Sequence, residues 1–213
     1  MSGSGSNLGA ILAAIASGEL DAEVAVVISN KPGVRALERA AEAGVPSEVL
    51  SHRDHASREA YDRALVARLR AARVEWVVLA GFMRIVTSEL LDAFPDRVLN
   101  IHPALLPAFP GVDAQAQALA YGVRITGCTV HLVDAGVDTG PILAQAAVPV
   151  LPDDDRERLA ARILVEEHRL YVEVLRQIAA GRVLVEQAAG SGRRRAWIEA
   201  SPPAGVAEPA GRA

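Results

Sequence analysis

An asparagine and a histidine stand two residues apart at the end of a predicted strand. Asn100 and His102 close the segment 97–102, which is predicted to be a strand and is followed directly by Pro103. Residues i and i+2 of a strand point to the same face, so the two side chains should emerge together. An amide donor beside an imidazole that can carry a proton suits an oxyanion forming on a carbonyl carbon. From the spacing alone, a polar pair that ties the strand end to the next loop is an equally good interpretation.

An aspartate in a glycine-rich turn is the candidate partner for this histidine. Asp138 lies in the segment Gly-Val-Asp-Thr-Gly-Pro at residues 136–141. A carboxylate beside an imidazole stabilises the protonated ring and fixes its orientation. A turn-forming aspartate is the default alternative. Asp134, four residues earlier, is a weaker candidate for the same role.

Two further features could bind a substrate. Gly5, Ser6 and Asn7 run into a predicted helix, and glycine-rich backbone at a helix N-terminus can cradle a phosphate. Ser6 or Asn7 could instead be an ordinary N-cap. Glu167 falls inside the apolar stripe of a long predicted helix. A carboxylate there is costly unless it is paired or lines a cavity, so an internal ion pair and a cavity wall that receives an amine or hydroxyl both remain open.

The other polar candidates are weaker. Arg58 and Arg84 could contact an anion, although such residues are more often surface arginines, and His131 is expected to be a packed core histidine. Cys128 is the single cysteine, which excludes an internal disulfide and fits a reducing compartment. The sequence contains no HExxH, CxxC or GxSxG motif, so zinc-hydrolase, thiol-redox and serine-hydrolase chemistry lack support.

The elements that must position these residues alternate along the chain. Strands are predicted at residues 23–29, 47–50, 74–80, 97–102, 127–133, 142–150 and 182–187, and helices at 6–17, 34–43, 57–72, 87–93, 114–121 and 153–180. This alternation predicts an α/β fold, an open, mostly parallel, Rossmann-like sheet with helices on both faces. Such sheets bind ligands at the carboxyl ends of their strands, which is where the candidate residues fall.

Length and composition narrow the possible functions. The 213 residues suit one domain, which we place at 1–190, followed by an extension at 191–213 whose Pro, Gly and Ala content predicts partial disorder. The net charge of −4 disfavours a nucleic-acid binder that neutralises many phosphates. No apolar run reaches the roughly 18 residues needed to span a bilayer, and no basic signal-peptide region precedes an apolar one. We therefore expect a cytoplasmic protein without nucleic-acid or membrane partners.

Taken together, several collinear segments resemble the phosphoribosylglycinamide formyltransferases, folate-dependent enzymes of purine biosynthesis. The matching segments are SGSGSNL at 2–8, ISNK at 28–31, SREAYD at 57–62, LAGFMRIV at 79–86, LNIHPALLPAFPG at 99–111, TGCTVHLVDAGVDTGP at 126–141 and EEHRLY at 166–171. The NIHPALLP and VDTGP pair is typical of the wider formyltransferase superfamily. The SGSGSNL and LAGFMRI segments narrow the resemblance to this member.

The resemblance implies transfer of a formyl group from 10-formyltetrahydrofolate to the amine of 5′-phosphoribosylglycinamide, without a metal. His102 would be the general acid, Asn100 would stabilise the oxyanion and Asp138 would hold His102. The implied ribonucleotide contacts are Gly5, Ser6, Asn7 and Glu167, and the implied folate contacts are Arg58, Met83, Arg84, Ile85, Val86, Asn100, Asp134 and Asp138. The partners would be small molecules, and the protein a monomer or homodimer. The alternatives are a 10-formyltetrahydrofolate hydrolase, another amine formyltransferase, or a non-catalytic folate- or nucleotide-binding relative.

Two features depart from that family. Its members begin with a hydrophobic strand directly before the SGSGSNL segment, whereas this sequence begins at Met1 without one. That strand would be central in the sheet, so its absence should expose unpaired edges on both neighbouring strands. A start codon assigned too late is the simplest explanation, and a natural deletion is the alternative. Asp113 and Ala116 stand where the family often has His and Arg, which puts the local substrate contacts in question.

Overall fold

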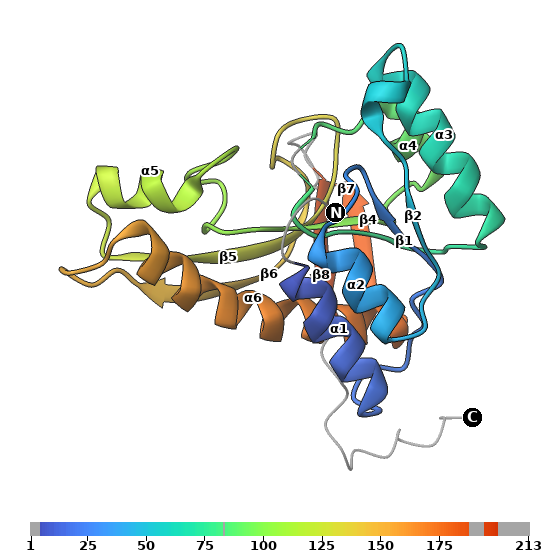
Figure 1. The fold of residues 1–213 in the computed structure, drawn as a ribbon. Helices are drawn as coiled ribbons and strands as arrows, with labels where there is room; N and C mark the ends of the chain where they lie inside the picture. Colours follow the sequence, from blue (N-terminus) through green and yellow to red (C-terminus); the bar gives the residue numbers. More distant parts are fainter. Residues whose placement is uncertain (1–4, 83, 188–193, 200–213) are drawn as a thin grey trace, which may run out of the picture.

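Figure 1 shows how short strands and longer helices alternate over residues 5–82, 84–187 and 194–199, the part of the chain that the computed structural model describes. The strands are β1 (Val27–Ser29), β2 (Ser47–Val49), β3 (Val77–Leu79), β4 (Val98–His102), β5 (Ile125–Leu132), β6 (Ile142–Pro149), β7 (Val183–Gln187) and β8 (Arg194–Ile198). The helices are α1 (Ser6–Ala16), α2 (Arg35–Glu42), α3 (Arg58–Ala71), α4 (Ser88–Ala93), α5 (Ala114–Tyr121) and α6 (Arg156–Ala179), with a short 3-10 helix η1 at His52–Asp54.

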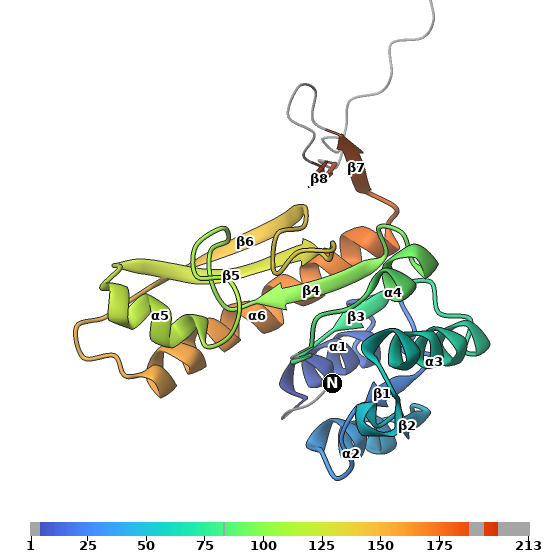
Figure 2. The same cartoon turned by 90° about the horizontal axis from the view of Figure 1, so that it is seen from above.

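The strands form one four-stranded sheet and two separate pairs. The four-stranded sheet has the order β3-β4-β5-β6, in which β3 and β4 are parallel and the two following pairings are antiparallel. β1 and β2 form a parallel pair of their own, beyond β3 in Figure 2. β7 and β8 form an antiparallel hairpin. The parallel strands therefore belong to the first half of the chain and the antiparallel ones to the second.

Helices cover both faces of the four-stranded sheet. Side chains of α1 and α6 pack with Leu99, Val130 and Leu132 in one buried cluster. Side chains of α3 and α4 pack with Val77 and Val98 in another. The two clusters use alternate residues of β4, as the two-residue period of a strand requires. The α/β fold with helices on both faces is confirmed, and no described helix is long and apolar enough to cross a membrane.

Two strands are shorter than their apolar runs predicted. The run 23–29 yields β1 only from Val27, and the run 74–80 yields β3 only from Val77 to Leu79. Ladder hydrogen bonds define a strand, and within the described part of the chain β1 pairs only with β2 and β3 only with β4. The first residues of both runs therefore lack a neighbouring strand, although their side chains are apolar enough for one.

The C-terminal hairpin contains a strand that the sequence analysis did not anticipate. β8 falls within the proposed extension at 191–213 and pairs with β7 over five residue pairs, from Val183 opposite Ile198 to Gln187 opposite Arg194. The remainder of that extension, 191–193 and 200–213, lies outside the described residues. The described part of the extension is thus hydrogen-bonded to the preceding segment.

The long helix α6 contains Glu167, the acidic residue predicted to lie within an apolar stripe. Its N-cap is Asp155, whose side chain accepts a hydrogen bond from the Arg158 N–H at 2.8 Å. The buried positions of α6 include Leu159, Ile163 and Leu170, spaced by four and seven residues. Glu167 lies on this same buried face, as its spacing predicted.

Candidate active site

The antiparallel pairing of β4 with β5 sets a histidine opposite the candidate asparagine. Asn100 stands opposite His131, and His102 stands opposite Thr129. Side chains of directly opposed residues lie on the same face of the sheet. The Asn100 side-chain amide donates a hydrogen bond to His131 Nε2 at 3.2 Å, and His131 Nδ1 donates to the Leu132 carbonyl at 2.9 Å. The orientation of the Asn100 amide is therefore fixed by the neighbouring strand.

His131 is buried but is more than the packed core residue expected from the sequence. Its side chain is 2% exposed, and burial lowers its pKa below the ordinary value for histidine. The neutral ring that results has one N–H, which the Leu132 carbonyl accepts, and one bare nitrogen, which faces Asn100. An amide nitrogen carries two hydrogens, so Asn100 can still donate the second one to a ligand.

The imidazole of His102 lies between two oxygen atoms. Its Nδ1 is 3.3 Å from Asp138 Oδ2, and its Nε2 donates to the Phe109 carbonyl at 2.8 Å. His102 is 4% exposed, so water contributes little to its solvation. A carbonyl only accepts, so Nε2 carries a hydrogen, and a second proton on Nδ1 would face a carboxylate. Both ring nitrogens of His102 therefore lie close to an oxygen acceptor of the protein.

Asp138 joins three segments of the site, which the sequence could not show. Besides His102, its Oδ2 accepts from the Gly111 N–H at 2.7 Å, and its Oδ1 lies 3.7 Å from His131 Nε2. The residue itself has a left-handed backbone with φ of 54°. Such a backbone costs energy for a residue other than glycine and persists where surrounding contacts hold it. The loop is thus shaped so that this carboxylate reaches His102.

Asp134, the weaker candidate partner of His102, forms hydrogen bonds within its own loop. Its Oδ1 accepts from the Gly136 N–H at 3.0 Å and from the Thr139 hydroxyl at 2.7 Å. These bonds close the turn that presents Asp138. Of the two aspartates, Asp138 contacts His102, whereas Asp134 shapes the loop, so the suggestion that Asp134 could play the same role is wrong.

A buried hydroxyl holds the loop that supplies the Phe109 carbonyl. Thr129 Oγ1 donates to the Ala104 carbonyl at 2.7 Å and accepts from the Leu106 N–H at 3.0 Å. The Gln145 side-chain amide donates to the same hydroxyl at 3.0 Å and to the Leu106 carbonyl at 2.9 Å. The loop also contains a cis peptide bond between Leu106 and Pro107. Both β5 and β6 therefore fix the backbone that follows His102.

The N-terminus of α1 is open to an anion. Its N-cap is Gly5, with φ of 65°, and no side chain of the described residues forms a capping hydrogen bond there. The proposed N-cap role of Ser6 or Asn7 is therefore wrong. A Cβ on Gly5 would lie 2.7 Å from the Cα of Ala36, so α2 approaches too closely for any larger residue. The first N–H groups of a helix have no partner within it, which together with the helix dipole favours a phosphate.

Asn7 and Glu167 meet in the interior although 160 residues separate them. The Asn7 amide donates to Glu167 Oε2 at 2.9 Å, and the two residues are 9% and 8% exposed. Burial raises the pKa of Glu167, an effect that the Asn7 hydrogen bond partly offsets. The partner of Glu167 is thus an amide, not the cation of an internal ion pair. Asn7 Oδ1 has no hydrogen-bond partner among the described residues, so a ligand N–H or O–H could satisfy it.

The residues expected to bind folate have mixed environments. The Arg84 guanidinium lies 5.2 Å from the centre of the Tyr61 ring, and Arg58 begins α3 at the surface. Ile85 is 50% exposed, whereas Val86 is buried with the apolar side chains of α3 and α4. Met83 lies outside the described residues. Val86 can thus offer a ligand only its backbone.

The two positions that depart from the resembled family lie on α5. Asp113 is its N-cap, with φ of 56°, and its Oδ1 accepts from Arg156 Nε at 2.7 Å. This contact joins α5 to the start of α6. Ala116 is half-buried one turn further along. The Asp113 carboxylate is therefore engaged by a cation of the protein.

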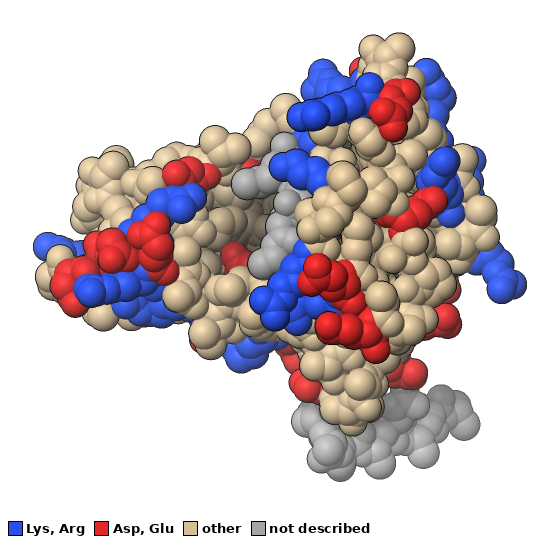
Figure 3. Space-filling view, viewed as in Figure 1, with Lys and Arg blue, Asp and Glu red and all other residues tan. Residues whose placement is uncertain are grey.

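Figure 3 shows the molecule hollowed between the lobe built from α5 and the first turns of α6 and the half that contains α1, α2 and α3. Charged residues gather at the far end of the lobe and around the opposite half. Within the described residues, no group of three or more His, Cys, Asp or Glu side chains could hold a metal ion.

Known proteins are similar to this chain in both sequence and fold. A sequence profile of the formyl transferase family matches residues 1–175, so the chain belongs to the formyl transferase family. The chain is 51% identical over 194 residues to phosphoribosylglycinamide formyltransferase of Mycobacterium tuberculosis, which covers 91% of this chain and 89% of that protein. The crystal structure of glycinamide ribonucleotide transformylase 1 from Symbiobacterium toebii matches with a TM-score of 0.88 and 53% identity, over 93% of this chain and 91% of that one. The resemblance drawn from the motifs is confirmed.

A longer relative contains a similar segment. The trifunctional purine biosynthetic protein adenosine-3 of Drosophila melanogaster is 50% identical over 187 residues, which are 87% of this chain and 14% of that protein. The chain thus spans about one seventh of the length of that relative.

Proposed function

We propose that this chain transfers a formyl group from 10-formyltetrahydrofolate to the amine of 5′-phosphoribosylglycinamide. The observation that carries the proposal is the position of His102 between Asp138 and the Phe109 carbonyl, on the same strand as an Asn100 amide oriented by His131. A proton source and an amide donor side by side suit the negative charge that develops on the formyl oxygen when an amine attacks its carbon. Relatives that cover most of the chain carry the corresponding name.

The phosphate and the glycinamide of the ribonucleotide would bind at the start of α1 and at the contact between Asn7 and Glu167. The phosphate would accept hydrogen bonds from the backbone at Gly5, Ser6 and Asn7, where no side chain caps the helix. The glycinamide end would meet Glu167 and the Asn7 carbonyl oxygen, which are buried acceptors suited to the N–H groups of an amine or amide. One short helix would therefore contact both ends of the substrate.

The proposed chemistry gives each polar residue of the β4 end one task. His102 would supply a proton to the reacting groups once its Nε2–H exchanges the Phe109 carbonyl for them. Asn100 would donate its second N–H to the formyl oxygen. Asp138 would stabilise the imidazolium and hold its ring plane. A general acid typically contributes ~10²–10⁴-fold, and loss of one oxyanion donor costs ~10²–10³-fold. The amine loses one proton and the departing folate nitrogen gains one, so no further reactant is needed.

The folate co-substrate would bind beside this centre. The cations Arg58 and Arg84 suit the carboxylates of the folate glutamate, and Tyr61 holds the Arg84 guanidinium in place. The backbone at Ile85 and Val86 and the loop from Asp134 to Asp138 offer hydrogen-bonding groups for the pterin ring. The chemistry that the co-substrate supplies is an activated formyl group.

The proposal is tested by following tetrahydrofolate release with and without the ribonucleotide. Release that requires the ribonucleotide supports the transferase. Release at the same rate without it indicates a 10-formyltetrahydrofolate hydrolase and overturns the proposal. Calorimetric binding of both ligands with no release also overturns it, in favour of a non-catalytic binding protein.

A further inference from the structure

Segment 84–87 lies between β3 and α4 and belongs to neither element, although it contains three of the residues proposed to contact folate. Among the described residues, no hydrogen bond involves the backbone N–H or carbonyl of Ile85 or Val86. These groups are therefore available to a ligand, but the segment lacks the ladder of hydrogen bonds that fixes a strand. Its position must come from its side chains and from its two ends.

A buried aspartate of α3 holds the last residue of this segment. Asp62 is 3% exposed, and its Oδ2 accepts hydrogen bonds from the Thr87 N–H at 2.7 Å and from the Thr87 hydroxyl at 2.8 Å. Thr87 is the N-cap of α4, but its side chain forms no capping hydrogen bond with that helix. An N-cap threonine ordinarily offers its side-chain oxygen to its own helix. Here the side chain of Thr87 is directed to α3 instead.

The burial of Asp62 is costly, which indicates that its carboxylate has a specific task. A buried carboxylate lowers stability unless hydrogen bonds or a cation compensate for the lost water. Within the described part of the chain, its hydrogen-bond partners are the two groups of Thr87, and no cation forms an ion pair with it. An apolar side chain of similar size could pack with the surrounding cluster of α3 and α4 at less cost. The carboxylate is best explained by the segment that it fixes.

The first residue of the segment is held by the preceding residue of α3. The Arg84 guanidinium lies 5.2 Å from the centre of the Tyr61 ring, a cation–π contact. Between the two ends, Val86 is buried and Ile85 is exposed. Two consecutive residues of α3 thus contact the two ends of a segment of four residues, and the backbone between these contacts is free to bind a ligand.

We propose that Asp62 is a positioning residue for the folate co-substrate and acts through Thr87 to fix the backbone at Ile85 and Val86. This inference rests on the proposed function, in which that backbone pairs with the pterin ring. A planar ring needs its backbone partners in alignment, because hydrogen bonds weaken steeply below an angle of about 120°. The proposed ribonucleotide contacts at α1 and Glu167 do not include this segment. Loss of the Asp62 contact should therefore weaken folate binding selectively.

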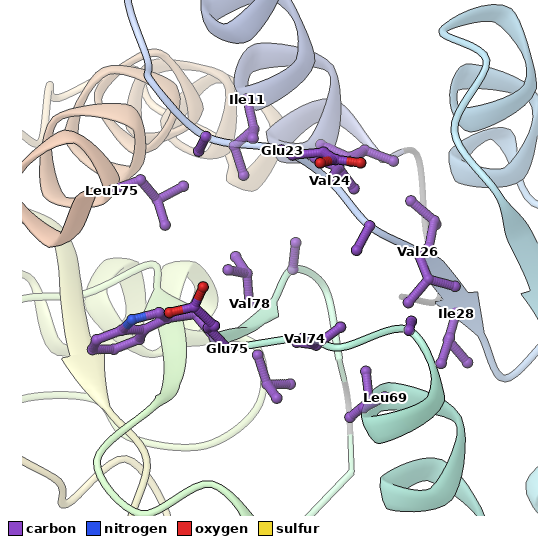
Figure 4. A pocket seen from close by; sticks show the side chains of 18 of the residues that line it. Ile11, Glu23, Val24, Val26, Ile28, Leu69, Val74, Glu75, Val78 and Leu175 are labelled. Carbon is purple, nitrogen blue, oxygen red and sulfur yellow. The ribbon is translucent and has the colours of Figure 1, made fainter.

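Tyr61 and Asp62 face different surroundings, which makes Asp62 the better residue to substitute. Consecutive residues of a helix point about 100° apart. Tyr61 lines a cavity of about 700 Å³ between β1 and β3, and Figure 4 shows apolar side chains such as Leu69 and Val78 pointing into it. Asp62 is not among the described residues that line this cavity, and it faces Thr87 at the start of α4. A substitution at Asp62 therefore leaves the side chains around the cavity in place.

The test measures the KM of both substrates in the transfer assay. We expect Asp62→Ala to raise the KM for 10-formyltetrahydrofolate about tenfold, with kcat and the KM for the ribonucleotide within about threefold of the parent. Glu89→Gln is the matched control, because it breaks the exposed ion pair of Arg63 with Glu89 that also joins α3 to α4, and it should leave both KM values unchanged. An unchanged folate KM in Asp62→Ala, or an equal rise in both KM values, would overturn the proposal.

Substitutions at Thr87 keep the proposal testable if Asp62→Ala does not fold. Thr87→Val removes the hydroxyl donor at nearly the same volume and keeps the N–H, so the folate KM should rise by a smaller factor of about three. Thr87→Ser keeps both donors and should restore the parental KM. Equal folate KM values in these two variants would contradict the role of the contact. The double variant Asp62→Ala/Thr87→Val should bind folate no worse than Asp62→Ala alone, since both changes remove one contact.

Calorimetry with 10-formyltetrahydrofolate alone separates this inference from the proposed function. We expect the Kd of Asp62→Ala to be about ten times that of the parent, whether or not the formyl group is transferred. A parent chain that binds folate without transfer refutes the proposed function, and the Kd of the variant still decides the role of Asp62. Transfer by the parent together with equal Kd values refutes only the role of Asp62. A parent chain that does not bind folate refutes both.

Discussion

The two regions that the proposed reaction needs are supported very differently. At the end of β4, the catalytic candidates lie on a strand with a neighbour on each side, and His131 of β5 and Asp138 contact them. Gln145 of β6 helps to hold the loop that follows β4. At the start of α1, the proposed phosphate site adjoins the cavity between β1 and β3. We therefore expect substitutions at the β4 end to act mainly on kcat, and substitutions at Gly5 to act mainly on ribonucleotide binding and on stability.

The largest effect should come from removing the imidazole at the β4 end. We expect His102→Ala to lower kcat by about 10³-fold, because the proton source and the charge beside the formyl oxygen are lost together. His102 is buried and bonded to two oxygens, so Tm should also fall by several degrees while the protein stays folded at the assay temperature. Retention of more than about a tenth of the parental kcat would remove His102 from the mechanism.

The next effect concerns the carboxylate that holds this imidazole. Asp138→Asn should lower kcat by about 10²-fold, because an amide no longer stabilises the imidazolium. Asp134→Asn is the matched control in the same loop, since its side chain only closes the turn. Steady-state kinetics of the two variants that gave equal losses would show that loop shape, and not the Asp138 charge, is what matters.

The proposed phosphate site should respond in binding and in stability. Gly5→Ala forces a Cβ against Ala36 at 2.7 Å in a backbone with φ of 65°, so we expect a loss of about 1–3 kcal/mol in the free energy of unfolding. The KM for the ribonucleotide should rise about tenfold or more with a smaller change in kcat. Gly9→Ala is the control, because its Cβ would meet only the movable guanidinium of Arg39. Equal effects of the two substitutions would argue against a special role for Gly5.

The smallest effect is a pH dependence at Glu167. Burial raises its pKa, so the neutral carboxyl is the form that the fold favours, and its contribution to stability is present below the ordinary glutamate pKa and lost as pH rises through the raised value. Glu167→Gln keeps an acceptor for Asn7 and removes this loss. Denaturant unfolding should therefore show the variant gaining stability relative to the parent as pH rises from about 4 to neutral. A stability difference that does not change with pH would contradict a buried carboxyl whose described partner is a neutral amide.

The local pattern of apolar and polar residues predicted most helices and strands. It could not predict contacts between segments that are distant in the sequence. The two-residue spacing of Asn100 and His102 placed both on one strand because side-chain direction alternates along a strand. The position of His131 opposite Asn100 depends on the register of an antiparallel pair 31 residues apart, which no local pattern specifies. The sequence offered one clue to His131, which is its position within a predicted strand, directly after the segment TGCTV at 126–130.

The same limit applies to the substrate-binding candidates. The stripe on α6 showed that Glu167 is buried, but its partner Asn7 comes from the other end of the chain. β8 went unnoticed because its sequence, Arg-Arg-Ala-Trp-Ile, is too polar to resemble a buried strand, and it pairs only at the edge with β7. The roles assigned to these side chains stay predictions until the variants are measured.

The fate of the formyl group tests the central claim most directly. The ribonucleotide would be incubated with isotope-labelled 10-formyltetrahydrofolate and either the parent chain or His102→Ala, and the products analysed by mass spectrometry. We predict that the parent places the label on the ribonucleotide amine and that the variant does so about 10³-fold more slowly. Label found as free formate, or label transferred equally by both proteins, would contradict the account.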